Sequence, residues 1–196
     1  NLIKPGIKLT VIDGKGMLPK LNTKTGLNLT IKTMPEKNKM IGFMVSSKPF
    51  SPVMIFSERL YAGLNNDEFE WVALHESGHY LMWHNLKLAL TQLSILFIGV
   101  IIINFLQNII ISPLSAFFLG YIYIQLAKIF EYQADHFAVS KMDNPNGMIT
   151  GNIKMSKVNE RLMGGTGFLQ SLIIAVSPQE RIKMAEEEIE KRKIER

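Results

Sequence analysis

Apolar residues dominate one long stretch of the chain, residues 88–127, which contains no Asp, Glu, Lys, Arg or His. A first apolar segment covers residues 88–111, Ser112-Pro113 interrupts it, and a second, more aromatic segment covers residues 114–129. About 20 apolar residues in a helix cross the hydrocarbon core of a bilayer, and proline commonly starts a helix after a turn. The pattern predicts a hairpin of two transmembrane helices. Because the second segment is short, a hairpin buried in the core of a soluble protein is the alternative.

The pattern before this stretch is different. Residues 7–12, 27–31, 41–45 and 52–57 alternate or lie between turn signals, which predicts four short strands. A proline at position 52 suits the first residue of a strand at the edge of a sheet. A helix then begins at Asn66-Asp67-Glu68, where an Asn cap precedes acidic residues, and runs through His79. The pattern leaves open whether this helix continues into the first apolar segment.

After the hairpin, residues 128–141 are predicted to extend the second apolar helix. Residues 142–166 contain Asn-Pro-Asn-Gly and Gly-Gly-Thr-Gly, which indicate loops. The apolar run 168–176 is too short to cross a membrane. Ser177-Pro178-Gln179-Glu180 forms a capping box with proline at the first helical position, and it predicts a charged, solvated helix to about Lys193.

Composition and charge exclude several classes of protein and of binding partner. The 196 residues suit one domain, or one domain with a membrane appendage, and 47% hydrophobic residues exclude a disordered chain. The absence of Cys excludes disulfides, thiolate zinc sites and cysteine nucleophiles. The net charge of +5 is modest and lacks interleaved aromatic residues, so we expect no nucleic-acid partner, whereas a lipid bilayer fits. Lys and Arg lie on both flanks of the hairpin and not between its helices, which predicts that both flanks face the cytoplasm.

The sequence His75-Glu76-Ser77-Gly78-His79 is an H-E-x-x-H zinc motif. Residues four apart lie on one face of a helix, so His75 and His79 can present both imidazoles to one metal ion. The Glu76 carboxylate adjoins the first ligand and can reach a metal-bound water.

A third ligand is available after the hairpin, in the segment Glu131-Tyr132-Gln133-Ala134-Asp135. Catalytic zinc uses three protein ligands, and two His with one Glu is a common set, so Glu131 would complete the site with one Zn²⁺ per chain. Asp135 lies one turn further on the same face and is a candidate to orient a ligand histidine. The hairpin returns the chain to the side it left, so the two motif helices can lie side by side.

Residues 43–182 resemble the membrane zinc metallopeptidases that include the HtpX-type proteases, the CAAX prenyl endopeptidases and the mitochondrial protease OMA. The resemblance rests on residues 67–79 with H-E-x-x-H, two apolar segments, and residues 131–138, which reproduce the family's E-x-x-A-D-x-x-A. Glu180-Arg181-Ile182 matches the E-R-I of the family's last motif, although Ser177-Pro178 stands where the family has H-P.

The resemblance implies that His75, His79 and Glu131 bind zinc, that Glu76 is the general base and that Asp135 supports a ligand. It implies an α+β, zincin-like catalytic domain, in which a small sheet accompanies the active-site helix and the glutamate helix, with the transmembrane hairpin inserted. The strands and the H-E-x-x-H helix of the catalytic domain would occupy residues 1–87. The transmembrane hairpin would occupy residues 88–129, and the C-terminal helical part of the catalytic domain would occupy residues 130–196.

The family's architecture also implies that a polypeptide substrate adds as an extended strand along residues 52–57, with contacts from Val53, Met54, Ile55 and Phe56. Arg181 is a candidate transition-state stabiliser, although an ion-pair role is the stronger interpretation. His84 lies nine residues after His75, off the face of the motif, and is interpreted as an interfacial residue. His136 is interpreted as a packing or surface residue.

The expected function is therefore that of a membrane-anchored zinc endopeptidase of the cell membrane, multi-pass, with a cytoplasmic active site, acting on membrane or misfolded proteins. Two alternatives remain. One is a zinc-dependent membrane sensor that acts by docking or self-cleavage. The other is an intramembrane protease of the site-two type, whose later N-P-D-G motif is echoed by residues 144–147, although Asn146 stands in place of the metal-binding Asp. Substrate identity and oligomeric state are not predicted.

Overall fold

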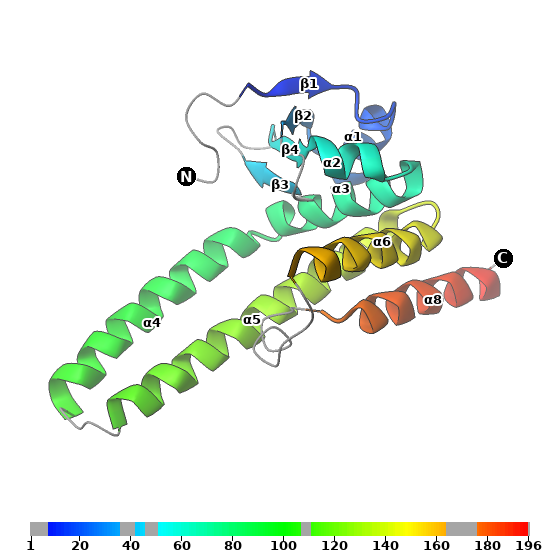
Figure 1. Ribbon diagram of the computed structural model, residues 1–196. Helices are drawn as coiled ribbons and strands as arrows, with labels where there is room; N and C mark the ends of the chain where they lie inside the picture. The colour runs from blue at the N-terminus through cyan, green and yellow to red at the C-terminus, as the bar shows by residue number, and fades with distance from the viewer. Residues whose placement is uncertain (1–7, 36–41, 46–50, 107–110, 164–175, 196) are drawn as a thin grey trace.

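The structure is a computed structural model that describes residues 8–35, 42–45, 51–106, 111–163 and 176–195. The described chain is mostly helical with one small sheet (Figure 1), so both kinds of element in the α+β prediction are present. The strands are β1 (Thr10–Ile12), β2 (Thr30–Met34), β3 (Gly42–Val45) and β4 (Val53–Ser57). The helices are α1 (Leu18–Thr25), α2 (Glu58–Gly63), α3 (Asn66–Leu81), α4 (His84–Leu106), α5 (Ile111–Lys141), α6 (Asn146–Met163) and α8 (Pro178–Ile194).

The sheet has the strand order β1-β2-β4-β3, so β4 lies inside it. β4 pairs in parallel with β2 and antiparallel with β3. The prediction that Val53, Met54, Ile55 and Phe56 line a sheet edge is therefore wrong. The prediction relied on Pro52, which suits an edge strand. Pro52 precedes the first residue pair that β4 forms with its neighbours, where its missing N–H removes no hydrogen bond between strands. The edge strand on that side is β3, which packs against α3.

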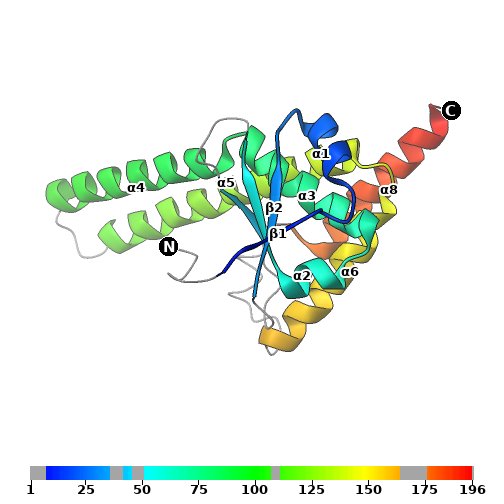
Figure 2. The same cartoon turned by 90° about the horizontal axis from the view of Figure 1, so that it is seen from above.

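Helix α3, which carries the H-E-x-x-H sequence, lies between the sheet on one side and α5 and α6 on the other (Figures 1 and 2). Its first turn is held by a capping box in which Asn65 and Glu68 bond each other's main-chain N–H groups. Phe69, fully buried, meets the Phe56 ring of β4 edge to face at 5.3 Å and the Tyr61 ring of α2 at 5.5 Å. Burial of large aromatic surface is a strong stabilising term, so these contacts fix α3 beneath the sheet.

Two helices were not predicted, and both pack against α3. The short helix α1 has Pro19 in its first turn and ends at Gly26, whose φ of 71° lies in the left-handed region. Helix α6 occupies residues 146–163, which the loop prediction covered. Its glycines serve close packing: a Cβ atom at Gly147 would lie 2.5 Å from the Asp67 main chain, and one at Gly151 would lie 2.9 Å from the Trp71 ring.

Helix α3 does not continue into the apolar hairpin. It ends at Leu81, and Trp83 adopts φ 59° before α4 begins at His84. This conformation is unusual for a bulky residue. The Trp83 N–H donates to the Tyr80 carbonyl, and the Trp83 carbonyl accepts from the Lys87 N–H. The break changes both the direction and the rotation of the chain between α3 and α4.

Helices α4 and α5 pack against each other and project from the rest of the molecule as a hairpin (Figures 1 and 2). Both are long and apolar enough to cross a membrane. Many of their large apolar side chains are exposed, and Leu93, Phe97 and Phe117 are more than 60% exposed. The hairpin is therefore not the buried core of the described chain, and that alternative is contradicted.

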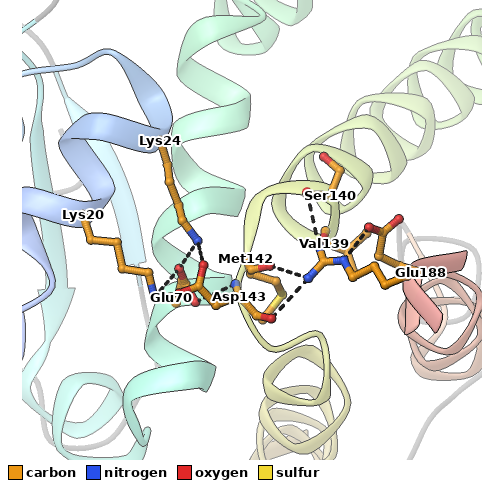
Figure 3. Close-up of polar contacts among 9 residues, drawn as sticks. Lys20, Lys24, Glu70, Val139, Ser140, Met142, Asp143 and Glu188 are labelled. Carbon is orange, nitrogen blue, oxygen red and sulfur yellow. Dashed lines mark hydrogen bonds and ion pairs between the residues drawn. The ribbon is translucent and has the colours of Figure 1, made fainter. Parts of the chain in front are cut away.

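One arginine fastens α8 to the C-terminal end of α5 (Figure 3). The two terminal nitrogens of Arg192 donate to four main-chain carbonyls at 2.9–3.2 Å, and its Nε donates to Glu188 at 2.8 Å. The carbonyls are those of Val139, Ser140, Met142 and Asp143. The last carbonyls of a helix have no partner within it, so the guanidinium caps this end of α5.

A buried carboxylate ties α1 and the end of α5 to α3 (Figure 3). Glu70 of α3 has a fully buried side chain, and its carboxylate accepts from Lys20 at 3.0 Å and Lys24 at 2.7 Å. It also accepts from the Asp143 N–H at 3.2 Å, and the Asp143 carboxylate pairs with the same two lysines. These contacts hold the C-terminal end of α5 beside α3, and thereby help to place the site-bearing turns of both helices.

Candidate metal centre

Helix α3 supplies two imidazoles to one point. His75 and His79 lie four residues apart, and their Nε2 atoms are 3.1 Å from each other. Their side chains are 13% and 14% exposed, so solvent reaches them only partly. The helical prediction for residues 66–79 is confirmed, with the capping residue one position earlier, at Asn65.

Helix α5 brings Glu131 to the same point. Glu131 Oε2 is 3.5 Å from His75 Nε2, and Oε1 is 3.3 Å from His79 Nε2. The two helices approach closely because Gly78 has no side chain: a Cβ atom there would lie 3.3 Å from Ala134 Cα. A small residue at this crossing therefore allows α3 and α5 to share one site.

The spacing of the three donors fits a metal ion. Atoms bonded to tetrahedral zinc at about 2.0–2.1 Å lie about 3.3 Å apart. The three closest donor separations here are 3.1, 3.3 and 3.5 Å. Among the described residues, His75, His79 and Glu131 form the one group of three or more such side chains close enough to hold a metal. Two neutral imidazoles and a carboxylate are also a ligand set that catalytic zinc commonly uses.

Asp135 and Arg181 contact the side chains that could bind the metal. Asp135 Oδ1 is 2.9 Å from His75 Nδ1, and the carboxylate is fully buried. Arg181, in the first turn of α8, donates from Nε to Asp135 Oδ2 at 2.7 Å and from Nη2 to Glu131 Oε2 at 3.3 Å. The guanidinium thus binds both α5 carboxylates of the site. The role of Arg181 as a transition-state stabiliser stays a prediction.

The acidic groups favour a cation at this point. Burial alone would lower the pKa of His75, but hydrogen bonds to Asp135 and Glu131 raise the pKa of His75 to about 10. Burial raises the pKa of Glu76, and Glu131 adds to this, while the two histidines oppose it. A carboxyl group with a raised pKa accepts a proton more readily, as a general base requires.

The interpretation of His84 as an interfacial residue is wrong. Its side chain is fully buried at the site, and its Nδ1 is 3.0 Å from His79 Nδ1. The position counted from His75 falls on the opposite face of an unbroken helix, whereas the break at Trp83 returns it to His79. The left-handed φ at a tryptophan carries no sequence signal. His136 is exposed, as expected of a surface residue.

Comparison with known proteins places the chain in a family. The sequence model of peptidase family M48 matches residues 19–189. The chain belongs to peptidase family M48. Members of family M48 are zinc metallopeptidases, and the resemblance drawn from the sequence motifs is confirmed. No curated protein matches the chain.

A solved structure shares the M48 fold seen here. The crystal structure of Ste24p from S. mikatae superimposes with a TM-score of 0.69 at 16% sequence identity. The similarity covers 91% of this chain and 51% of Ste24p, so the chain spans about half the length of that protein. At this identity the likeness shows the fold alone.

Proposed function

We propose that this M48 chain is a membrane-anchored zinc endopeptidase with one Zn²⁺ held by His75, His79 and Glu131. The observation that carries the proposal is the meeting of three ligand side chains from two helices, with His79 and Glu131 52 residues apart in sequence. Their closest nitrogen and oxygen atoms are separated by 3.1–3.5 Å. Structural convergence of this chemical set points to a metal centre more strongly than either motif alone. Family membership supports peptide hydrolysis as the reaction.

Zinc in such a site supplies Lewis-acid polarisation of the scissile carbonyl and a water of lowered pKa. Glu76 takes the proton of the attacking water on its carboxylate and delivers it to the leaving amine. Asp135 accepts from His75 Nδ1–H, which keeps the His75 Nε2 lone pair directed at the centre. Arg181 holds the carboxylates of Asp135 and Glu131 in place.

The polypeptide substrate aligns along β3 rather than β4. An extended peptide binds a sheet through the unpaired edge of an outer strand. β3 is the outer strand at that side of the described sheet, and it packs against the helix that carries His75 and His79. A peptide added beside residues 42–45 would therefore run near the centre.

The bilayer surrounds the α4–α5 hairpin in this proposal. The two helices carry their apolar side chains outward, and the described part of the catalytic unit does not cover them. Lys and Arg flank the hairpin on both sides and are absent from residues 88–127. By the positive-inside rule, this charge distribution supports a centre on the cytoplasmic face of the cell membrane. The substrates are membrane or misfolded proteins.

Family membership sets aside the site-two alternative, because the motif helix belongs to an M48 peptidase. The H-E-x-x-H helix α3 also lies outside the apolar hairpin, and Asn146 is exposed and bonds Asn144. The sensor alternative is distinguished by activity alone, since it shares the metal site.

The first experiment measures zinc and cleavage on one preparation. The full chain is purified in detergent, zinc per chain is determined by mass spectrometry, and casein cleavage is followed for wild type, Glu76→Gln and Glu131→Ala. Glu187→Gln is the matched control, because this carboxylate is 65% exposed on α8. We expect about one zinc in wild type and Glu76→Gln, loss of zinc in Glu131→Ala, and cleavage only in wild type and the control. Wild type without zinc would refute the proposal, and zinc without cleavage would favour the sensor.

The absence of Cys allows a second, topological experiment. Single cysteines at Leu114 and Lys157 are labelled in spheroplasts with a membrane-impermeant maleimide. Both positions are exposed in the structure, Leu114 near the start of α5 and Lys157 on α6. We expect Leu114→Cys to react from outside and Lys157→Cys to react only after permeabilisation. The reverse pattern would place the centre on the outer face.

A further inference from the structure

We propose that His84 orients the zinc ligand His79 by accepting its Nδ1 proton, and that Gln133 in turn fixes His84. The inference rests on the proposed zinc centre and adds to it a positioning residue from a third helix. It follows from the contacts of one fully buried imidazole at the first residue of α4.

Three neighbours hold the His84 ring. Its Nδ1 lies 3.0 Å from His79 Nδ1, and its Nε2 lies 3.1 Å from Gln133 Oε1. Its face stacks on the Phe130 ring, with centroids 4.5 Å apart and planes 6° from parallel. The ring therefore has both nitrogens in hydrogen-bond distance of a partner and one defined plane.

The protons along this chain of contacts follow from the donor set. His79 Nε2 faces Glu131 and His75, so a zinc-binding His79 presents its lone pair there and carries its proton on Nδ1. The His79 Nδ1–H then donates to His84 Nδ1. A neutral His84 must carry its own proton on Nε2, where it donates to the Gln133 amide oxygen. Each contact is satisfied in this one arrangement.

The two zinc ligands consequently have different supports. His75 donates to the Asp135 carboxylate, which is anionic and which Arg181 binds. His79 donates to a neutral imidazole. A ligand histidine usually donates its second N–H to a carboxylate, a main-chain carbonyl or water, so this pairing is uncommon. It orients His79 without placing another negative charge beside a centre that already has Glu76, Glu131 and Asp135.

The turn at Trp83 makes the contact possible. In a continuous helix residue 84 would be rotated by about 140° from residue 79, since each residue turns by about 100°. The left-handed Trp83 resets this rotation and brings the first turn of α4 against α3 and α5. The series of hydrogen bonds from His79 through His84 ends at Gln133. Gln133, Trp83 and Tyr132 border an open pocket of about 750 Å³.

The test uses three substitutions in the full chain. His84→Phe keeps an aromatic ring to stack on Phe130 but removes both hydrogen bonds. His84→Asn keeps an acceptor oxygen near the position of Nδ1. Gln133→Met, at an exposed residue, leaves His84 in place and removes its acceptor. Zinc affinity is measured by chelator competition, the Co²⁺ form by its visible spectrum, and the ring N–H groups by ¹⁵N NMR.

We expect His84→Phe to weaken zinc binding about 10–100-fold, as loss of a ligand's hydrogen-bond partner does, and to change the Co²⁺ spectrum. His84→Asn should lie within about threefold of wild type, since it retains the acceptor. In wild type, NMR should show protons on His79 Nδ1 and His84 Nε2 that exchange slowly with solvent. Gln133→Met should lose the protected His84 Nε2–H and weaken zinc binding several-fold.

Equal zinc affinity in wild type and His84→Phe would overturn the inference while leaving the proposed zinc centre intact. Equal weakening in His84→Phe and His84→Asn would also overturn it, because packing rather than the acceptor would then matter. If His84→Phe shows no thermal unfolding transition, the result with Gln133→Met decides, and an unchanged affinity and NMR spectrum there would overturn the inference. Wild type that binds no zinc would refute the proposed function and the inference together.

Discussion

The Arg192 cap on α5 makes a quantitative test of how α8 is held. Replacing Arg192 by Met keeps most of the aliphatic stem and removes the guanidinium. The substitution releases the carbonyls of Val139, Ser140, Met142 and Asp143 together with Glu188. Because Arg192 is 26% exposed, water can replace only part of what is lost.

The magnitude follows from the partners. A hydrogen bond to a charged group contributes about 1.5–3 kcal/mol, and a cation at a helix C-terminus adds about 0.3–1 kcal/mol. Val139 and Met142 are buried, whereas Ser140 and Asp143 are exposed and can bond water instead. We therefore expect Arg192→Met to lower the free energy of unfolding by about 2–3 kcal/mol in all. For a chain of this length that corresponds to a fall in Tm of roughly 5–10 °C.

Thermal unfolding in detergent with excess chelator measures this without the contribution of bound metal. Arg192→Lys keeps the charge but cannot bridge four carbonyls, so its loss should be intermediate. Lys193→Met is the matched control, because this side chain is 67% exposed and pairs only with an exposed Glu190 among the contacts described. Its effect should stay within about 0.5 kcal/mol. An Arg192→Met loss no larger than that of Lys193→Met would refute the capping argument.

Three further predictions concern the site and its surroundings. Trp83→Asn should leave the free energy of unfolding unchanged or raise it by up to about 1 kcal/mol, as thermal unfolding measures. The reason is that Asn tolerates a left-handed φ and that Trp83 is 65% exposed. A clear fall in the free energy of unfolding would mean that the contacts of Trp83 outweigh its backbone strain. Gly78→Leu should weaken zinc binding at least about tenfold in chelator competition, because a side chain there separates α3 from α5 at Ala134; wild-type affinity would show that the close approach does not set the site. The raised pKa of His75 implies that its protonation stabilises the metal-free fold fully below about pH 6.5 and that this contribution is lost as the pH rises toward about 10. The Tm of the chelated protein should therefore fall across that range, and zinc binding near neutral pH should release about one proton, as titration calorimetry in two buffers measures; a Tm that rises across the range would contradict the assignment.

The two motif helices were predictable because periodicity alone decides which residues share their faces. His75 and His79, like Glu131 and Asp135, are four residues apart, and each pair lies on one helix face in the structure. The uncharged hairpin between them predicted an antiparallel return. These are local patterns, and within a long helix the sequence spacing of two residues still predicts which face they share in the folded protein.

The elements that sequence reasoning missed depend on distant contacts. Helix α1 is short and polar, and it is fixed by Leu21 in the core and by ion pairs to Glu70, 46 residues from Lys24. Asn144-Pro145-Asn146-Gly147 suggested a loop, yet Gly147 lies in α6, where it and Gly151 allow close packing on α3. In both cases tertiary packing outweighed the local preference.

The interior position of β4 and the role of His84 were missed for related reasons. A proline before a strand permits an edge but does not require one, and only the pairing partners decide. His84 was assigned by its count from His75, which presumes an unbroken helix. One main-chain torsion at Trp83 invalidates that count.

Helix α5 is continuous from Ile111 to Lys141, so a single rod carries both the apolar segment and Glu131. A helix rises about 1.5 Å per residue, which puts Glu131 about 6 Å along the axis beyond Ala127, the last residue of the uncharged run. With the hairpin in a bilayer, the height of the metal centre above the hydrocarbon is then set by helix geometry rather than by a loop. A substrate peptide bond many residues from the membrane surface would have to move toward the bilayer to meet the metal centre. A substrate peptide bond close to the surface would already lie at the height of the centre.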